Sequence, residues 1–239
     1  MKILIKLLIS FGAVVGFCNC SVVPSKTHMV KNGFAFAVLA SDGSVHTWGE
    51  QPYGGNSSAV SSLIASGVTS VVPSRFAFAA ERLGGSIISW GVDSATSSDF
   101  EAYTDAISGS LVGNEAAFAF LSSDGGGGKV MAFGSKFHGG NVVNDKYCND
   151  YSTQLSSNVA EIIASAGSFA ARKNDGSVYA WGNKHTGSGV STETMPTLTN
   201  AQKIVATREA FAVLQTNGSV VTWGSKWSGG DSSPPSPAS

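Results

Sequence analysis

An aromatic residue followed by glycine, as in Trp48-Gly49, recurs five times at spacings of 42 to 48 residues in this 239-residue chain. Aromatic or histidine residues follow four of these pairs, and lysines follow three of the four. Lysines stand three positions beyond the aromatic residue of three of these pairs, and aromatic or histidine side chains come one or two positions later. Exposed aromatic side chains beside cations are enriched on binding surfaces, where they offer apolar contact and positive charge. The candidate partner-binding residues are Tyr53, Lys136, Phe137, His138, Lys184, His185, Lys226 and Trp227.

Catalytic patterns are missing from the sequence. The four histidines, His28, His46, His138 and His185, stand at scattered positions, and Cys148 has no partner at the spacing of zinc ligands. The chain has no His-Glu-x-x-His motif, no phosphate-binding loop with its lysine and no Gly-x-Ser-x-Gly turn. A hydrolase would need such residues, so we expect no enzymatic activity, no cofactor and no metal ion.

Composition excludes two further classes of protein. With 15 Lys and Arg against 16 Asp and Glu, the net charge is −1, whereas proteins that neutralise nucleic-acid phosphates carry a basic excess. The chain is 42% hydrophobic and 10% aromatic, which is far from the composition of disordered chains. We therefore expect a globular protein that does not bind nucleic acid.

The first 20 residues read as a secretory signal. Lys2 precedes an apolar run from Ile3 to Phe17 that is interrupted only by Lys6 and Ser10. This run is shorter than the roughly 20 apolar residues that span a bilayer. Cleavage before Ser21 would give a mature chain without a stable membrane span, secreted or at the cell surface, in an extracellular or periplasmic location. An uncleaved anchor is the alternative.

Five similar units follow, because the five aromatic–glycine pairs recur at spacings of 42, 43, 48 and 42 residues. A Phe-Ala pair stands 12 residues before the aromatic residue in four units and 15 residues before it in the third. The aromatic–glycine pairs are Trp48-Gly49, Trp90-Gly91, Phe133-Gly134, Trp181-Gly182 and Trp223-Gly224. Regular self-similarity of this length is the signature of a repeat architecture.

Each unit reads as about three short strands and a connection. Asp42-Gly43 lies between two apolar segments and predicts a tight hairpin with a type I′ turn. Such a turn needs positive φ at both central residues, which is why Asp-Gly is preferred there. The segment Phe36–Leu39 is apolar on both faces, which favours a sheet between two neighbours. Residues 59–67 predict a short helical turn between units. Its last position should tolerate left-handed backbone and is occupied in successive units by Gly67, Gly109, Asn158 and Asn200.

These units predict an all-β fold, a β-propeller or open propeller-like array of about five blades of roughly 42 residues. The expected organisation is a signal peptide at 1–20, an N-terminal segment at 21–28 that could complete the last blade, repeats at 29–233 and a Pro/Ser tail at 234–239. The recurring aromatic residues are expected to form the core between blades. Equivalent loops of a propeller share one face, so the candidate residues should form an arc there.

The pattern AFAVL-x-x-DGSV-x-x-WG-x-x-x-x-GG resembles the regulator of chromosome condensation repeat. In unit size the chain is most similar to the secreted propeller-type β-lactamase inhibitor proteins of that superfamily. The resemblance covers nearly all of residues 29–233 and implies the propeller fold, although five units depart from the family's usual seven blades. Members that bind chromatin and drive nucleotide exchange on a small GTPase act inside cells, which does not fit a secretory signal.

Our functional hypothesis is a secreted, non-enzymatic propeller that binds a protein or glycan partner through loops on one face. The alternative is a structural or adhesive cell-surface repeat protein with no discrete site. A monomer is expected in either case.

Overall fold

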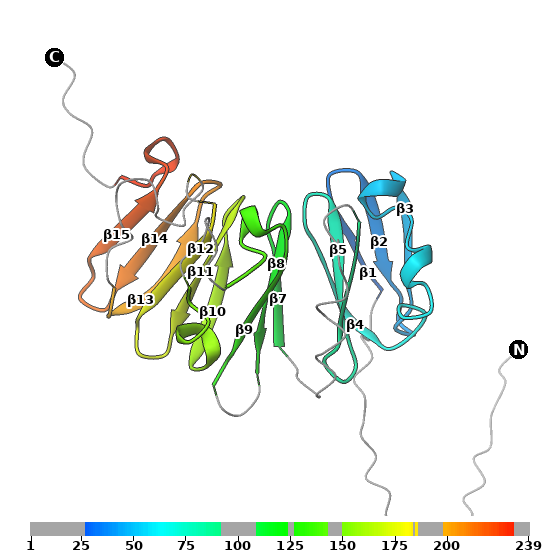
Figure 1. Cartoon of the computed structure of the whole chain (residues 1–239), viewed down its shortest axis with the longest axis horizontal. Coiled ribbons are helices and arrows are strands. Elements are labelled where there is room, and N and C mark those ends of the chain that lie inside the picture. The colour runs from blue at the N-terminus through cyan, green and yellow to red at the C-terminus, as the bar shows by residue number, and fades with distance from the viewer. Residues whose placement is uncertain are drawn as a thin grey trace, which may run out of the picture.

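The structure, a computed structural model, describes residues 27–91, 109–123, 127–142, 150–183, 185 and 198–231. These residues form five three-stranded antiparallel sheets, which we call blades one to five, and the strand order in each blade follows the chain. Figure 1 shows the blades side by side in sequence order, from β1–β3 at one end to β13–β15 at the other. The predicted all-β propeller architecture of five blades is confirmed.

The strands of the first three blades are β1 (His28–Lys31), β2 (Ala35–Leu39), β3 (Val45–Gly49), β4 (Val68–Pro73), β5 (Ala77–Arg82), β6 (Ile87–Gly91), β7 (Gly109–Gly113), β8 (Ala117–Ser122) and β9 (Val130–Gly134). Those of the last two blades are β10 (Val159–Ala164), β11 (Ser168–Lys173), β12 (Val178–Gly182), β13 (Ala201–Ala206), β14 (Ala210–Gln215) and β15 (Val220–Gly224). Short 3-10 turns connect them at η1 (Gln51–Tyr53), η2 (Ser58–Val60), η4 (Lys136–His138), η5 (Gln154–Ser156) and η7 (Lys226–Ser228).

Cross-strand pairing explains the fixed spacing between the two aromatic landmarks of each unit. Phe36 lies directly opposite Trp48 in the β2–β3 hairpin, and their rings stack with centroids 5.5 Å apart. The equivalent stacked pairs are Phe78–Trp90, Phe118–Phe133, Phe169–Trp181 and Phe211–Trp223. The hairpin register therefore sets the spacing, since aromatic partners on one face of a strand pair stabilise each other.

The hairpin turn differs from the predicted type I′ geometry. Gly43 has φ 81°, but Asp42 does not share a positive φ, and the Gly43 N–H donates to Ala40 O over 3.0 Å. This is an ordinary turn followed by one left-handed glycine. The Asp42 side chain supports it, because its Oδ1 accepts bonds from the Ser44 backbone and hydroxyl. These bonds hold the pKa of the Asp42 carboxyl below its ordinary value.

Short helical turns between blades are confirmed at η2 and η5. The predicted left-handed stop is found at Gly67, with φ 72°, and at Asn158, with φ 65°. It is wrong for Gly109, which begins β7, and for Asn200, whose φ is not positive. Gly109 is instead paired with Ser122 within its sheet.

The core lies between blades, because alternate residues of each middle strand point to opposite neighbours. In blade one, Ala35 and Ala37 face blade two and pack in one cluster with Phe78 and Trp90. The same arrangement recurs at the other three junctions, with small alanines on one side and the aromatic pair of the following blade on the other. The expected role of the aromatic residues as inter-blade core is confirmed for blades two to five, where all of them are buried.

Two sets of predicted segments fall outside the described residues. They are the signal at 1–20 with most of the segment at 21–28, and the tail at 234–239. His28, the last residue of the predicted N-terminal segment, is the first residue of β1. The domain boundaries proposed from sequence stay predictions. No helix among the described residues is long and apolar enough to cross a membrane.

Candidate binding face

Three equivalent 3-10 turns stand at one edge of the array, each just after the third strand of its blade. Figure 1 shows the turns that follow β3, β9 and β15 along its upper edge. Each turn starts from an extended residue and ends at a left-handed glycine, at Gly54, Gly139 and Gly229. The glycine lets the chain reverse within one residue, since it adopts positive φ without the steric cost of a Cβ.

A polar residue at the end of the first strand fixes each turn to its own blade. The Asn32 side chain donates from Nδ2 to Tyr53 O over 2.7 Å, and Asn114 does the same to His138 O over 2.7 Å. In blade five, the Thr207 hydroxyl donates to Ser228 O over 2.8 Å. These bonds hold the 3-10 turns beside the bends that join the first and second strands.

The bends themselves are joined across blades by a ladder of backbone hydrogen bonds. Each of the first four bends donates one N–H to the carbonyl of the equivalent residue in the next blade. The bonds run from Gly33 to Arg75 (3.1 Å), Arg75 to Glu115 (3.1 Å), Glu115 to Ala166 (2.9 Å) and Ala166 to Arg208 (2.8 Å). We call the surface formed by these five bends and the turns η1, η4 and η7 the turn face.

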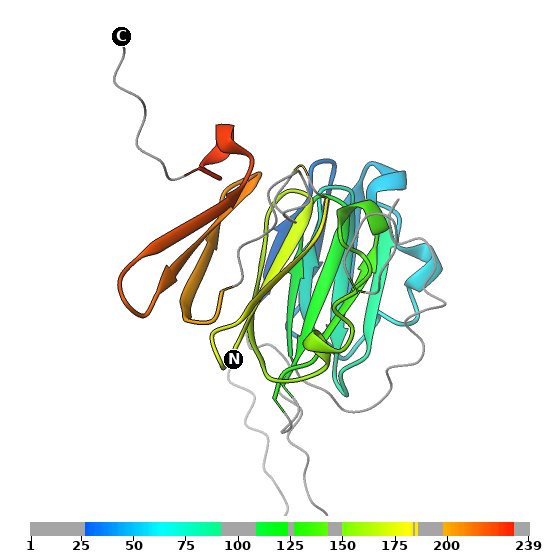
Figure 2. The same cartoon turned by 60° about the vertical axis from the view of Figure 1, so that its left-hand side comes forward.

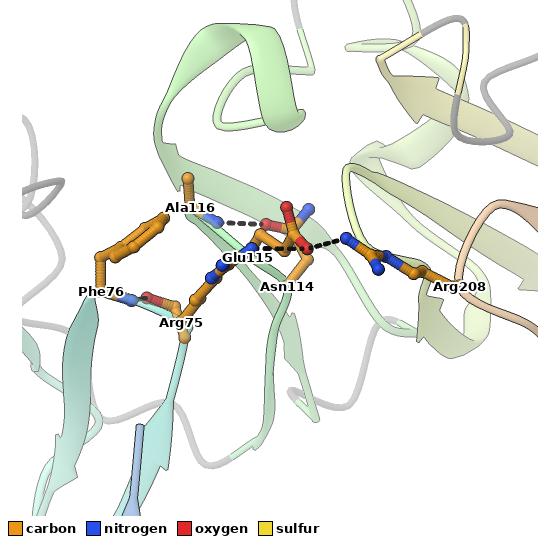
Figure 3. Close-up of polar contacts among 7 residues, drawn as sticks. Arg75, Phe76, Asn114, Glu115, Ala116 and Arg208 are labelled. Atoms are coloured by element: carbon orange, nitrogen blue, oxygen red, sulfur yellow. Dashed lines mark hydrogen bonds and ion pairs between the residues drawn. The ribbon is translucent and has the colours of Figure 1, made fainter. Parts of the chain in front are cut away.

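Ion pairs link three blades at the centre of the turn face. Figure 3 shows the Glu115 carboxylate between the guanidinium groups of Arg75 and Arg208, at 3.4 Å and 3.3 Å. Both arginines are substantially exposed, so these pairs add little to stability. They leave one net positive charge at this point of the surface.

The predicted binding residues in η1, η4 and η7 lie on the turn face. Tyr53 ends η1, while Lys136, Phe137 and His138 form η4, and Lys226 and Trp227 begin η7. His185 follows β12, where its N–H donates to Asn183 Oδ1 over 2.8 Å, and Lys184 lies outside the described residues. The residues are brought together within each turn and separated between turns by a blade.

Trp227 is the most exposed large apolar side chain of the described residues, with 88% of its surface accessible. The ammonium of Lys226 lies 5.2 Å from its ring centroid, a distance at which cation–π attraction acts. In η4, the Phe137 and His138 rings meet edge to face with centroids 5.4 Å apart. The two turns thus present the same pairing of an aromatic ring with a neighbouring polar or charged group.

An aromatic cluster that the sequence analysis missed adjoins η1. The rings of Phe34, Tyr53 and Phe76 lie with centroids 4.5 to 5.7 Å apart, and the Arg75 guanidinium stands 5.1 Å from the centroid of Phe76. Phe34 and Phe76 are the residues directly before Ala35 and Ala77, and this position is not aromatic in the other blades. Its irregular occurrence hid it from an analysis based on recurring residues.

The described residues contain no group of three His, Cys, Asp or Glu side chains that could hold a metal ion. Burial raises the pKa of Glu81 above its ordinary value, although the Gly109 N–H favours the charged form. Glu81 lies between blades two and three, away from the turn face. The chemistry of the turn face is therefore contact through aromatic rings and charges.

Comparison with solved structures identifies the fold. The structure of Prp20p from Saccharomyces cerevisiae matches 82% of this chain with a TM-score of 0.50 and 16% identity. Yeast RCC1 (Prp20) bound to Kap60 matches 84% of the chain, also with a TM-score of 0.50 and 16% identity. The chain has the regulator of chromosome condensation repeat fold. The matched part of the chain spans 56% of the length of each of these propellers.

The ectodomain of the receptor kinase CR4 from Physcomitrella patens also matches, with a TM-score of 0.49, 15% identity and coverage of 83% of this chain and 51% of that chain. No family model and no curated protein matches the sequence. The repeat is recognisable from its glycine and aromatic positions. The similarity of unit size to the β-lactamase inhibitor proteins stays a prediction.

Proposed function

We propose that the protein is a secreted, non-enzymatic propeller that binds a protein partner through its turn face. The observation that carries the proposal is the turn η7, which presents the nearly fully exposed Trp227 beside Lys226. An exposed tryptophan costs free energy of hydration unless it contacts a partner, and tryptophan is the residue most enriched at binding hot spots.

Two further features support this surface. Phe137 in η4 and Phe34 in the blade-one bend are both exposed, so the aromatic residues extend over more than one blade. The hydrogen bonds from Asn32, Asn114 and Thr207 preorganise the turns, which lowers the entropy lost on binding. Net positive charge at the Arg75–Glu115–Arg208 group and the lysines of η4 and η7 would favour an acidic partner.

The fold is suited to this role in other proteins. Prp20p was described with its binding to Gsp1p and histones, and yeast RCC1 was described in complex with Kap60. An extracellular location rests on the apolar segment after Lys2, which predicts a secretory signal. The proposal needs only one copy of the chain and assigns no reaction to it.

The test compares two double variants by partner retention. The first, Trp227→Ala with Lys136→Glu, alters the turn face, and the second, Leu83→Ala with Lys129→Glu, alters the opposite edge, where both residues lie in hairpin turns. Both remove one exposed apolar side chain and reverse one charge. We expect the first variant to retain extracellular partners at least about tenfold more weakly than the wild type, and the second to retain them fully.

Equal retention by the first variant and the wild type, with unchanged circular dichroism, would exclude the turn face as the binding surface. Retention that disappears when the captured partner is deglycosylated would assign the face to glycans instead. Loss in both variants would indicate a surface spread over the whole array.

A further inference from the structure

The two end blades each expose a face that is buried at every internal junction. In blades two to five, the phenylalanine of the stacked pair is at most 1% exposed, but Phe36 of blade one is 38% exposed. Its partner Trp48 is 47% exposed, whereas its counterparts in the other blades are buried. The ring stack itself is intact in blade one, so what it lacks is the cover that a preceding blade supplies.

At the two junctions whose preceding turn is described, the 3-10 turn of the preceding blade covers the aromatic pair. A Cβ added at Gly54 would lie 2.7 Å from Cδ2 of Phe78, and the Trp90 indole donates to Gly54 O over 3.1 Å. Blades three and four repeat the contact, since the Trp181 indole donates to Gly139 O over 2.9 Å. Glycine is required at this position because the aromatic ring of the next blade occupies the space of a side chain.

Blade five presents the opposite half of the same contact, and no blade among the described residues covers it. Gly229 has the left-handed conformation of Gly54 and Gly139, but a Cβ added there would have no atom within 4 Å. Ala212 is half-buried, whereas the equivalent alanines of the other four blades are fully buried. Val220 is 54% exposed, although the equivalent residues Val45, Ile87, Val130 and Val178 are buried.

We infer that the exposed face of blade five binds the exposed face of blade one of a second copy of this chain, head to tail. Trp48 of one copy would lie against Gly229 of the other and donate its indole N–H to that carbonyl. Phe36 would lie on Ala212 and Val220. The Arg208 N–H would donate to Gly33 O of the next copy and so continue the backbone ladder.

We infer a second copy as the partner because the two exposed end faces match the two sides of an internal junction. The four internal junctions share small residues on one side and an aromatic pair on the other, and the two junctions that follow blades one and three also show the glycine turn. The two unpaired surfaces lie on blades at opposite ends of the array (Figure 1), and Figure 2 shows blade five at the left edge of the view. A second copy can supply the missing half of each contact.

Head-to-tail contacts of this kind use two different surfaces, so each dimer keeps one free copy of each surface. The mass of the assembly should therefore rise with concentration and not stop at a dimer. This inference differs from the monomer expected from the sequence.

The test uses one variant that blocks each surface. Ala212→Arg fills the blade-five face, and Phe36→Arg places a charge on the blade-one face. Leu63→Arg, at an exposed position on the loop between blades one and two, is the matched control. Sedimentation equilibrium of the wild type and of Leu63→Arg should show masses above one chain that increase with concentration.

Each blocking variant alone should associate at least about tenfold more weakly than the wild type. An equimolar mixture of the two should form a heterodimer and nothing larger, because each variant keeps one intact surface and the intact surfaces are complementary. Circular dichroism of each variant confirms folding before the measurement.

Two results would overturn the inference. One is a wild-type protein that stays at the mass of one chain up to the highest concentration studied, as ring closure within the chain would give. The other is self-association that persists in both blocking variants, or a mixture that fails to form a heterodimer.

Discussion

The Phe169–Trp181 pair of blade four and the Phe36–Trp48 pair of blade one have the same chemistry in different surroundings. Their ring centroids lie 5.4 Å and 5.5 Å apart, so the hairpin alone builds both stacks. The blade-four pair is fully buried beneath Gly139 and the alanines of blade three, whereas the blade-one pair faces solvent. Local sequence therefore determines the stack, and a neighbouring blade determines how much that stack contributes to stability.

Replacing Trp181 or Trp48 with alanine should give the largest difference in stability between the covered stack and the uncovered stack. Trp181→Ala removes a fully buried ring and its bond to Gly139 O, so we expect a loss of about 3–5 kcal/mol in the free energy of unfolding. Trp48→Ala removes a half-exposed ring, and the loss should be about 1 kcal/mol. Urea denaturation measures both at a concentration where the protein is monomeric, and equal losses would contradict the comparison.

Substituting the turn glycines sharpens the same contrast. Gly139→Ala places a Cβ 3.0 Å from Cδ2 of Phe169 and 3.2 Å from Cδ1 of Trp181, at φ 87°. Backbone strain and overpacking together should cost about 2–4 kcal/mol. Gly229→Ala meets no neighbouring atom and bears the backbone strain alone, about 1 kcal/mol. Thermal unfolding of both variants should show the larger fall in Tm for Gly139→Ala.

The junction between blades two and three offers a smaller, pH-dependent effect at Glu81. Because burial raises its pKa, the folded protein holds the Glu81 proton more tightly than the unfolded chain does. The resulting stability is fully present below the ordinary pKa of 4.5 and is lost as pH rises through the raised value. Glu81→Gln should therefore stabilise the protein at neutral pH by up to about 1 kcal/mol and have no such effect at about pH 3.

Glu50→Gln is the control for that experiment, since it removes an exposed carboxylate from the turn face. Stabilisation of the same size by both substitutions would show that net charge, and not burial at the junction, is responsible.

The smallest effect is expected for the ion pairs of the turn face. Glu115→Gln removes two pairs with exposed arginines but leaves the Glu115 backbone in the ladder. The loss of stability should be under about 0.5 kcal/mol and should decrease as salt is added. A loss comparable to that of Trp181→Ala would mean that the bends are held by side chains and not by the backbone ladder.

The repeat sequence was sufficient to predict the blades, the hairpins and the inter-blade core, because the recurring glycines and aromatic residues occupy positions with strict steric demands. The turn type was wrong because Asp42 supports its turn through its side chain and not through a left-handed backbone. The ladder through Gly33, Arg75 and Ala166 gave no signal, since it uses only backbone atoms and so tolerates any side chain.

The candidate site was predicted in part for a related reason. Tyr53, Lys136 and Trp227 were found because they follow a recurring landmark, and the structure places them on one edge of the array. Phe34 and Phe76 were missed because their aromatic character occurs in two blades only. The uncovered end faces could not be predicted, since Phe36 and Ala212 carry the same residue types as their buried counterparts.

The central claim is that each aromatic pair is buried by the blade before it and that the first pair has no such cover. Hydroxyl-radical footprinting with mass spectrometry tests it directly, because it reports the solvent access of each tryptophan in the intact, dilute protein. We predict rapid modification of Trp48 and Trp227 and strong protection of Trp90, Trp181 and Trp223. Trp90 and Trp181 reacting as fast as Trp48 would contradict stacked blades, and a Trp48 protected at every dilution would contradict the uncovered first face.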